Sequence, residues 1–127
     1  MITDSKFSWR KRVMAFKYAW HGFKALLRYE HNARIHMVAA VAAIVAGAFS
    51  RLARWEWCAV VICIGLVISA EALNSAVEAL ADRITTEHDP LIGRAKDFGA
   101  TAVTLLALAA VGVGCIVFIP KFIALFS

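Results

Sequence analysis

Four polar residues recur along an otherwise apolar stretch at spacings that place them on one face of a helix: Glu71, Asn74, Glu78 and Asp82. At 100° per residue, the last three lie at about −60°, −20° and +20° from Glu71. A charged group at membrane depth costs roughly 2.5–3.5 kcal/mol. These four residues, the acidic stripe, are therefore expected to line a protein interior or a wet cleft rather than face lipid.

Two readings of the acidic stripe are open from the residues alone. Carboxylates from different elements are ligands for Mg²⁺ that retains waters and phosphate oxygens, and Glu71, nearest the apolar stretch, suits a general base acting on a hydroxyl. Alternatively, the stripe is a structural seam that pairs with Arg34, Arg83 or Lys96 to hold helices together.

A second polar group follows in the segment from Gly93 to Asp97, where Lys96 precedes Asp97. Basic side chains beside carboxylates suit a nucleotide polyphosphate. The sequence has no GxxxxGK[ST] loop and no kinase HRD motif. A phosphotransferase with this sequence would use none of the familiar soluble folds.

The elements that position these residues are predicted from hydropathy. The chain has 127 residues, 61% of them hydrophobic, against ~45–50% in soluble domains. A helix needs roughly 20 apolar residues to cross the hydrocarbon core, and Phe98–Ile119 supplies 22 without a charge. We predict one membrane domain, residues 1–127, with spans at about 35–53, 55–81 and 98–119.

The N-terminal region, residues 1–34, is basic and aromatic. Apolar side chains recur there at three- and four-residue steps: Trp9, Val13, Phe16, Trp20, Phe23 and Leu27. This pattern predicts an amphipathic helix over residues 9–30 that lies on the membrane surface. The predicted fold is thus an all-α membrane protein with an N-terminal surface helix and three transmembrane helices.

Eleven of the fourteen basic residues lie before the first span or in the 82–97 loop. Basic residues near span ends resist translocation, so both regions are predicted to be cytoplasmic. Attraction to anionic lipid headgroups accounts for the basic N-terminus, and we expect no nucleic-acid partner.

Other polar or small residues receive weaker interpretations. Ala39, Ala43 and Gly47 form a ridge that favours close helix packing within or between subunits. His31 and His36 are five residues apart rather than the four that align zinc ligands on one helix face. We therefore expect no metal role for the histidines, and an interfacial position for His36.

The segment Glu71-Ala-Leu-Asn-Ser-Ala-Val-Glu-Ala-Leu-Ala-Asp-Arg83, followed by Gly93-Arg-Ala-Lys-Asp97, resembles the signature of the prokaryotic diacylglycerol kinase family. The resemblance extends over nearly the whole chain. It implies an enzyme of the bacterial inner membrane that transfers the γ-phosphoryl group of ATP to a lipid hydroxyl with Mg²⁺. It further implies a homotrimer whose active sites are shared between subunits.

The resemblance also implies roles for individual residues. Glu71 matches the catalytic base, and Asn74 would orient Glu71 or the γ-phosphate. The matching metal and nucleotide positions are Glu30 and Glu78 for Mg²⁺ bridging the ATP phosphates, Lys96 and Asp97 for the nucleotide, and Glu87, His88 and Asp89 in the loop beside it. Asp82 has no catalytic counterpart, so helix termination or pairing with a basic side chain is expected of it.

The lipid is left open between two branches of the family. Ala19 stands where diacylglycerol-specific members have a serine, and the basic nucleotide contact falls among Arg10, Lys11 and Arg12. The stretch from Glu30 to His36 resembles the undecaprenol-kinase branch. Diacylglycerol and undecaprenol are both retained as candidate substrates.

A small cation-coupled transporter is the alternative from another functional class. Such a protein would place its key carboxylate near the membrane midplane. Glu71 follows Trp57 by 14 residues, about 21 Å along a helix, and so lies toward the cytoplasmic side of a ~30 Å core. This position favours an active site at the membrane surface.

Overall fold

A computed structural model describes residues 6–127, and those residues form four helices and no strand. The helices are α1 (Trp9–Tyr29), α2 (His31–Ser50), α3 (Arg54–Ile84) and α4 (Pro90–Phe126). The last three are each long and apolar enough to cross a membrane. The predicted all-α fold, with one helix preceding three spans, is confirmed.

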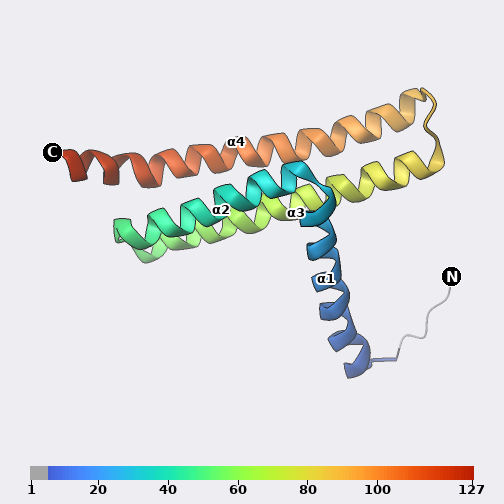
Figure 1. Ribbon diagram of the computed structural model, residues 1–127, viewed down its shortest axis with the longest axis horizontal. Helices are drawn as coiled ribbons and strands as arrows, with labels where there is room; N and C mark the ends of the chain where they lie inside the picture. Colours follow the sequence, from blue (N-terminus) through green and yellow to red (C-terminus); the bar gives the residue numbers. More distant parts are fainter. Residues whose placement is uncertain (1–5) are drawn as a thin grey trace.

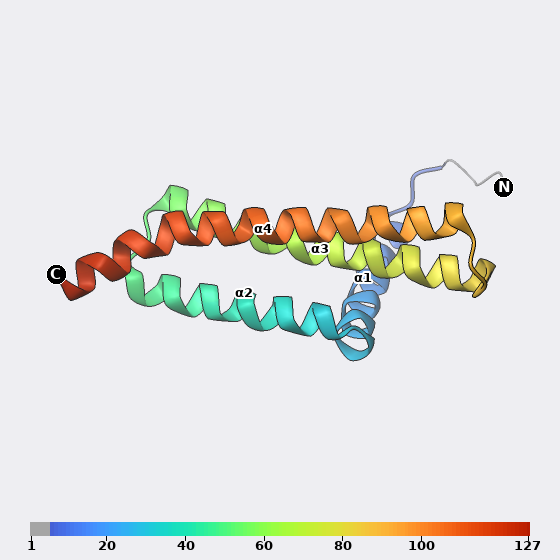
Figure 2. The same cartoon turned by 90° about the horizontal axis from the view of Figure 1, so that it is seen from above.

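Helix α1 leaves the bundle steeply, whereas α2, α3 and α4 run alongside one another (Figures 1 and 2). Its start is capped by Ser8, whose hydroxyl oxygen accepts a hydrogen bond from the Lys11 backbone at 3.4 Å. Trp9, Phe16 and Trp20 are exposed along it. A helix with exposed aromatic residues that turns away from a transmembrane bundle suits the predicted position on the membrane surface.

The corner between α1 and α2 is built around Glu30, whose extended backbone (φ −112°, ψ 115°) separates the two helices. The Arg34 guanidinium reaches back over this corner. Its Nε donates to the carbonyl of Leu27 at 2.6 Å, and its Nη2 donates to the carbonyl of Arg28. The last carbonyls of a helix lack partners within the helix. The Arg34 side chain therefore caps the C-terminus of α1 and fixes the angle between α1 and α2.

At the opposite end of the bundle, Arg51 ends α2 in the left-handed conformation (φ 52°). Glu56 then caps α3, because its Oε1 accepts a hydrogen bond from the Ala53 backbone at 2.8 Å. The same oxygen lies 3.2 Å from Nζ of Lys121 near the end of α4. The buried Glu56 therefore ties the start of α3 to the end of α4.

Helices α3 and α4 form a hairpin with the most extensive contact in the bundle. Asp89 caps α4, since its Oδ1 accepts hydrogen bonds from the backbone of Leu91 (2.9 Å) and Ile92 (3.1 Å). Pro90 occupies the first turn, where it loses no helical hydrogen bond. The hairpin tip extends beyond the α1–α2 corner in both views (Figures 1 and 2).

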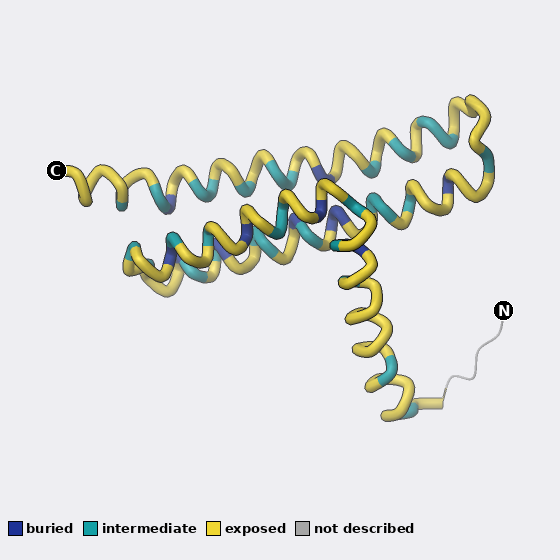
Figure 3. Tube along the Cα trace, in the orientation of Figure 1, coloured by how far each residue is buried: buried dark blue, intermediate teal, exposed yellow. Residues whose placement is uncertain are grey.

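The two hairpin helices are longer than a bilayer crossing requires. With 31 and 37 residues, they span about 46 Å and 55 Å against a hydrocarbon core of ~30 Å. Most residues of the bundle are exposed, and the buried ones lie on the faces where helices meet (Figure 3). The buried apolar residues are Leu26, Ala33, Ala40, Val60, Val67, Ala70, Ala81, Val103 and Val117.

Candidate functional site

Glu71 is the least exposed charged side chain among residues 6–127, with 2% of its surface accessible. It lies on α3 opposite α2, and its Oε2 is 3.5 Å from Nε2 of His36. That oxygen is buried and has no hydrogen-bond partner among the described residues. A buried acceptor without a partner is costly and is usually explained by strain, a bound group or a catalytic role.

His36 is a site residue that the sequence interpretation missed, because it was expected only to lie at the interface. In the structure, the His36 side chain points from α2 toward Glu71 on α3. One signal in the sequence could have found it. It is the one ionisable side chain between Arg34 and Arg51, and a polar group at that depth requires a polar partner.

Asn74 and Ser75 extend the group of unpartnered oxygens on α3. Oδ1 of Asn74 and Oγ of Ser75 are buried, and neither has a hydrogen-bond partner in the described part of the chain. Gly99 of α4 lies directly against the Asn74 amide, and a Cβ atom at position 99 would overlap Oδ1 of Asn74. Gly99, also missed from the sequence, thus allows α4 to pass close to this side chain.

Glu30 and Glu78, the predicted metal ligands, lie in the electrostatic neighbourhood of Glu71. The charges of both carboxylates act on Glu71, as does that of His36. Glu30 is half-buried at the α1–α2 corner, and Glu78 is exposed two turns beyond Glu71 on α3. Within residues 6–127, however, no three acidic, histidine or cysteine side chains converge closely enough to hold an ion. One chain therefore gathers the carboxylates without forming a complete ligand set.

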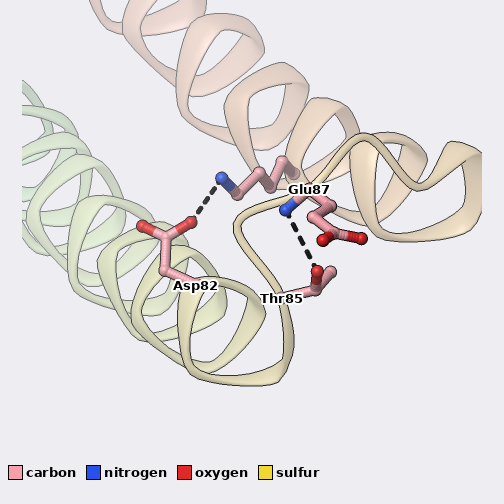
Figure 4. A network of polar contacts seen from close by, with 4 residues as sticks. Asp82, Thr85 and Glu87 are labelled. Atoms are coloured by element: carbon pink, nitrogen blue, oxygen red, sulfur yellow. Dashed lines mark hydrogen bonds and ion pairs between the residues drawn. The ribbon is translucent and has the colours of Figure 1, made fainter.

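Lys96 and Asp82 join the two helices of the hairpin near its tip. Nζ of Lys96 donates to Oδ1 of Asp82 at 2.6 Å (Figure 4). Asp82 thus has the basic partner expected of it. The charge of Glu78 also acts on Lys96, which links the lysine to the carboxylates around Glu71. Both members of the ion pair are substantially exposed, so it contributes little to stability and is accessible to a competing anion.

The remaining predicted nucleotide residues lie around the tip of the hairpin. Glu87, His88, Asp89 and Asp97 are all exposed. The backbone N–H of Glu87 donates to Oγ1 of Thr85 at 3.0 Å, which shapes the connection (Figure 4). Asp89 has a structural function as well, since its Oδ1 caps α4. The loop therefore presents one side chain that the fold already uses and two that are exposed, and Asp97 adds a further exposed carboxylate from α4.

An apolar cavity of about 250 Å³ lies between α2, α3 and α4. Its wall consists of small and branched side chains apart from His36 and Phe118. The residues that form it include Ala40, Ala43, Val67, Ala107, Gly114 and Phe118. Two residues of the predicted small-residue ridge, Ala39 and Ala43, face this space, whereas Gly47 packs against Trp57.

Known proteins resemble the chain over most of its length. The family model for prokaryotic diacylglycerol kinase matches residues 17–118. The undecaprenol kinase of Bacillus subtilis is 36% identical over 107 residues, which cover 84% of this chain and 87% of the relative. The diacylglycerol kinase of Escherichia coli K12 is also 36% identical, over 104 residues that cover 82% and 85% of the two chains.

These relatives are kinases, and the transporter alternative finds no support among them. The matched region contains α2 and α3 entirely and most of α1 and α4. It therefore includes Glu71, His36 and the hairpin tip. The chain belongs to the prokaryotic diacylglycerol kinase family and is a multi-pass lipid kinase, a phosphotransferase that acts on an alcohol group.

Proposed function

We propose that this lipid kinase transfers the γ-phosphoryl group of ATP to the hydroxyl of diacylglycerol or undecaprenol, with Glu71 as the general base. The observation that carries the proposal is the buried carboxylate of Glu71, whose Oε2 lacks a hydrogen-bond partner in the described chain. Two further carboxylates act on it electrostatically. Such a group has the reach and the surroundings to accept a proton from a substrate hydroxyl.

The reaction follows from these positions. Glu71 accepts the hydroxyl proton while the hydroxyl oxygen attacks the γ-phosphorus, and ADP leaves. Asn74, one helical turn further along α3, has a buried and unpartnered Oδ1. Its amide is placed to orient Glu71 or the γ-phosphate. Positioning of this kind supplies much of the catalysis in phosphoryl transfer.

The residues present fit a magnesium ion. Carboxylate oxygens are the hard ligands that Mg²⁺ prefers, and it keeps phosphate oxygens and waters for its remaining positions. Glu30 and Glu78 would hold it. When bound, Mg²⁺ would neutralise part of the charge on the ATP phosphates. The absence of a three-ligand group in residues 6–127 agrees with an ion that arrives together with the nucleotide.

The hairpin tip is proposed to bind the nucleotide. Lys96 would leave Asp82 and bind a phosphate oxygen. Breaking the ion pair costs little free energy because both side chains are exposed. The loop residues Glu87, His88 and Asp89 lie between α3 and α4, and Asp97 follows in the first turns of α4. A basic side chain among Arg10, Lys11 and Arg12 of α1 would add a further contact.

The proposed setting is the bacterial inner membrane, with α1 and the hairpin tip on the cytoplasmic side where ATP is found. The excess of basic residues in these regions supports that orientation. A homotrimer with shared active sites is part of the proposal. It is supported by the incomplete ligand set of one chain in residues 6–127.

A radiolabel assay on purified protein in mixed micelles tests this function. Labelled ATP or GTP is supplied with diacylglycerol or with undecaprenol, in the presence of Mg²⁺ or EDTA. We expect labelled lipid only with Mg²⁺, and the preferred lipid identifies the branch. If neither alcohol is phosphorylated by a folded protein, the proposal is wrong.

A further inference from the structure

His36 occupies a position that connects two features of the molecule. Its Nε2 lies 3.5 Å from Oε2 of Glu71, and its ring forms part of the wall of the apolar cavity between α2, α3 and α4. Its side chain is 22% exposed, against 3% for that of Glu71. The histidine therefore reaches from the membrane interior to the buried carboxylate.

The Glu71 carboxylate needs a donor that α3 itself does not provide. The neighbouring Asn74 and Ser75 present buried oxygens that are also without partners. Nε2 of His36 is the nitrogen atom that lies within ion-pair distance of Oε2 in the described part of the chain. A separation of 3.5 Å is at the outer limit of a hydrogen bond, and such catalytic contacts are often long before substrate binds.

We propose that His36 is a positioning residue for the kinase reaction. Its Nε2–H donates to Oε2 of Glu71 and fixes the carboxylate, so that Oε1 points at the lipid hydroxyl and accepts its proton. The inference rests on the proposed role of Glu71 as the base. His36, on α2, would thus act by holding the Glu71 carboxylate on α3, without direct contact with the transferred phosphate.

A packing role for His36 makes the opposite prediction about substitutions. The other residues of the cavity wall are apolar, mostly alanine, valine and isoleucine, and they suit a leucine better than a polar group. A glutamine places an amide N–H near the position of the imidazole Nε2–H. Packing therefore favours H36L over H36Q, whereas positioning favours H36Q over H36L.

The test compares kcat and KM for ATP in the wild-type protein, H36Q and H36L. The matched control is H21L, the same chemical change at an exposed histidine on α1. We expect H36L to lose about 10- to 100-fold in kcat, as removal of a hydrogen bond to a charged group implies. We expect H36Q to recover most of that loss, KM for ATP to stay constant in both, and H21L to match the wild type.

Two results would overturn the inference: an H36L variant with wild-type kcat, or an H36Q variant that is less active than H36L. If H36L does not fold, H36A takes its place in the same comparison with the same expectations. These outcomes differ from a failure of the proposed function, in which the wild-type protein itself would phosphorylate neither lipid.

Discussion

Asn74 lies on α3 one turn beyond Glu71, where Gly99 of α4 contacts its amide. Gly99 permits this approach, because a Cβ atom there would overlap the Asn74 amide oxygen. The amide is the far end of a flexible side chain, so it can move aside while the helices stay in contact. Position 99 therefore controls where the Asn74 side chain points.

Gly99→Ala is expected to displace the Asn74 amide and lower kcat by about 10- to 100-fold, since small misplacements in a reacting site are costly. The thermal midpoint of unfolding should change little. Gly112→Ala is the matched control, because nothing lies within 4 Å of a Cβ atom at that position on the same helix. Equal kcat values for the two variants would contradict this account of Gly99.

Lys96→Met is expected to raise KM for ATP at least about tenfold, because a charge-assisted contact to phosphate is lost. Asp82→Asn frees the lysine and should leave KM for ATP equal or lower. Neither change should alter stability appreciably, since the pair is exposed. Steady-state kinetics against ATP distinguish the two, and an unchanged KM in Lys96→Met would exclude Lys96 from the nucleotide site.

The acidic stripe was predictable because its residues share one helix, where spacing alone determines the face. His36 and Gly99 were not, because each meets α3 from a different helix. The way two helices cross depends on packing along their whole length, and no local pattern in the sequence encodes it. Arg34 was one of three basic residues that the structural alternative offered as partners of the acidic stripe, and its described hydrogen bonds are to backbone carbonyls instead.

At the scale of elements, Arg34 holds the corner that places Glu30. Arg34→Met removes the hydrogen bonds to the carbonyls of Leu27 and Arg28. The last turn of α1 should then exchange its amide hydrogens faster and kcat should fall, because Glu30 loses its fixed position. Hydrogen exchange measures the first effect. Lys17→Met, an exposed change on the same helix, should alter neither quantity.

The contact between Glu56 and Lys121 holds the opposite end of the bundle. Lys121→Met leaves the buried Glu56 carboxylate without its cation and should therefore lower the stability of the protein. Glu56→Gln removes the charge as well and should cost less. Unfolding in mixed micelles measures both. A Lys121→Met variant as stable as Glu56→Gln would contradict this role.

Hydropathy predicted the elements but not their ends. The third span was expected at 98–119, whereas α4 runs from Pro90 to Phe126. Hydropathy identifies the segment that crosses hydrocarbon, and a helix continues beyond it wherever caps and partners allow. Asp89 supplies such a cap at one end, and the Lys121 contact with Glu56 lies near the other.

For the whole molecule, the shared-site proposal leads to an assembly prediction. The purified protein should contain three chains by light scattering in detergent. Mixing the inactive Glu71→Gln protein with the Lys96→Met protein and reassembling them should lower KM for ATP toward the wild-type value, since a site shared between subunits can then receive both intact side chains. A fully active monomer would contradict this assembly.

The most direct test of the central claim compares two buried carboxylates on α3. Glu71 and Glu56 are 15 residues apart, roughly 22 Å along the helix, and both are buried. We predict that Glu71→Gln folds but loses ATP-dependent lipid phosphorylation, whereas Glu56→Gln retains the wild-type kcat per folded molecule. Substantial turnover by Glu71→Gln, or an equal loss in both variants, would contradict the assignment of Glu71 as the base.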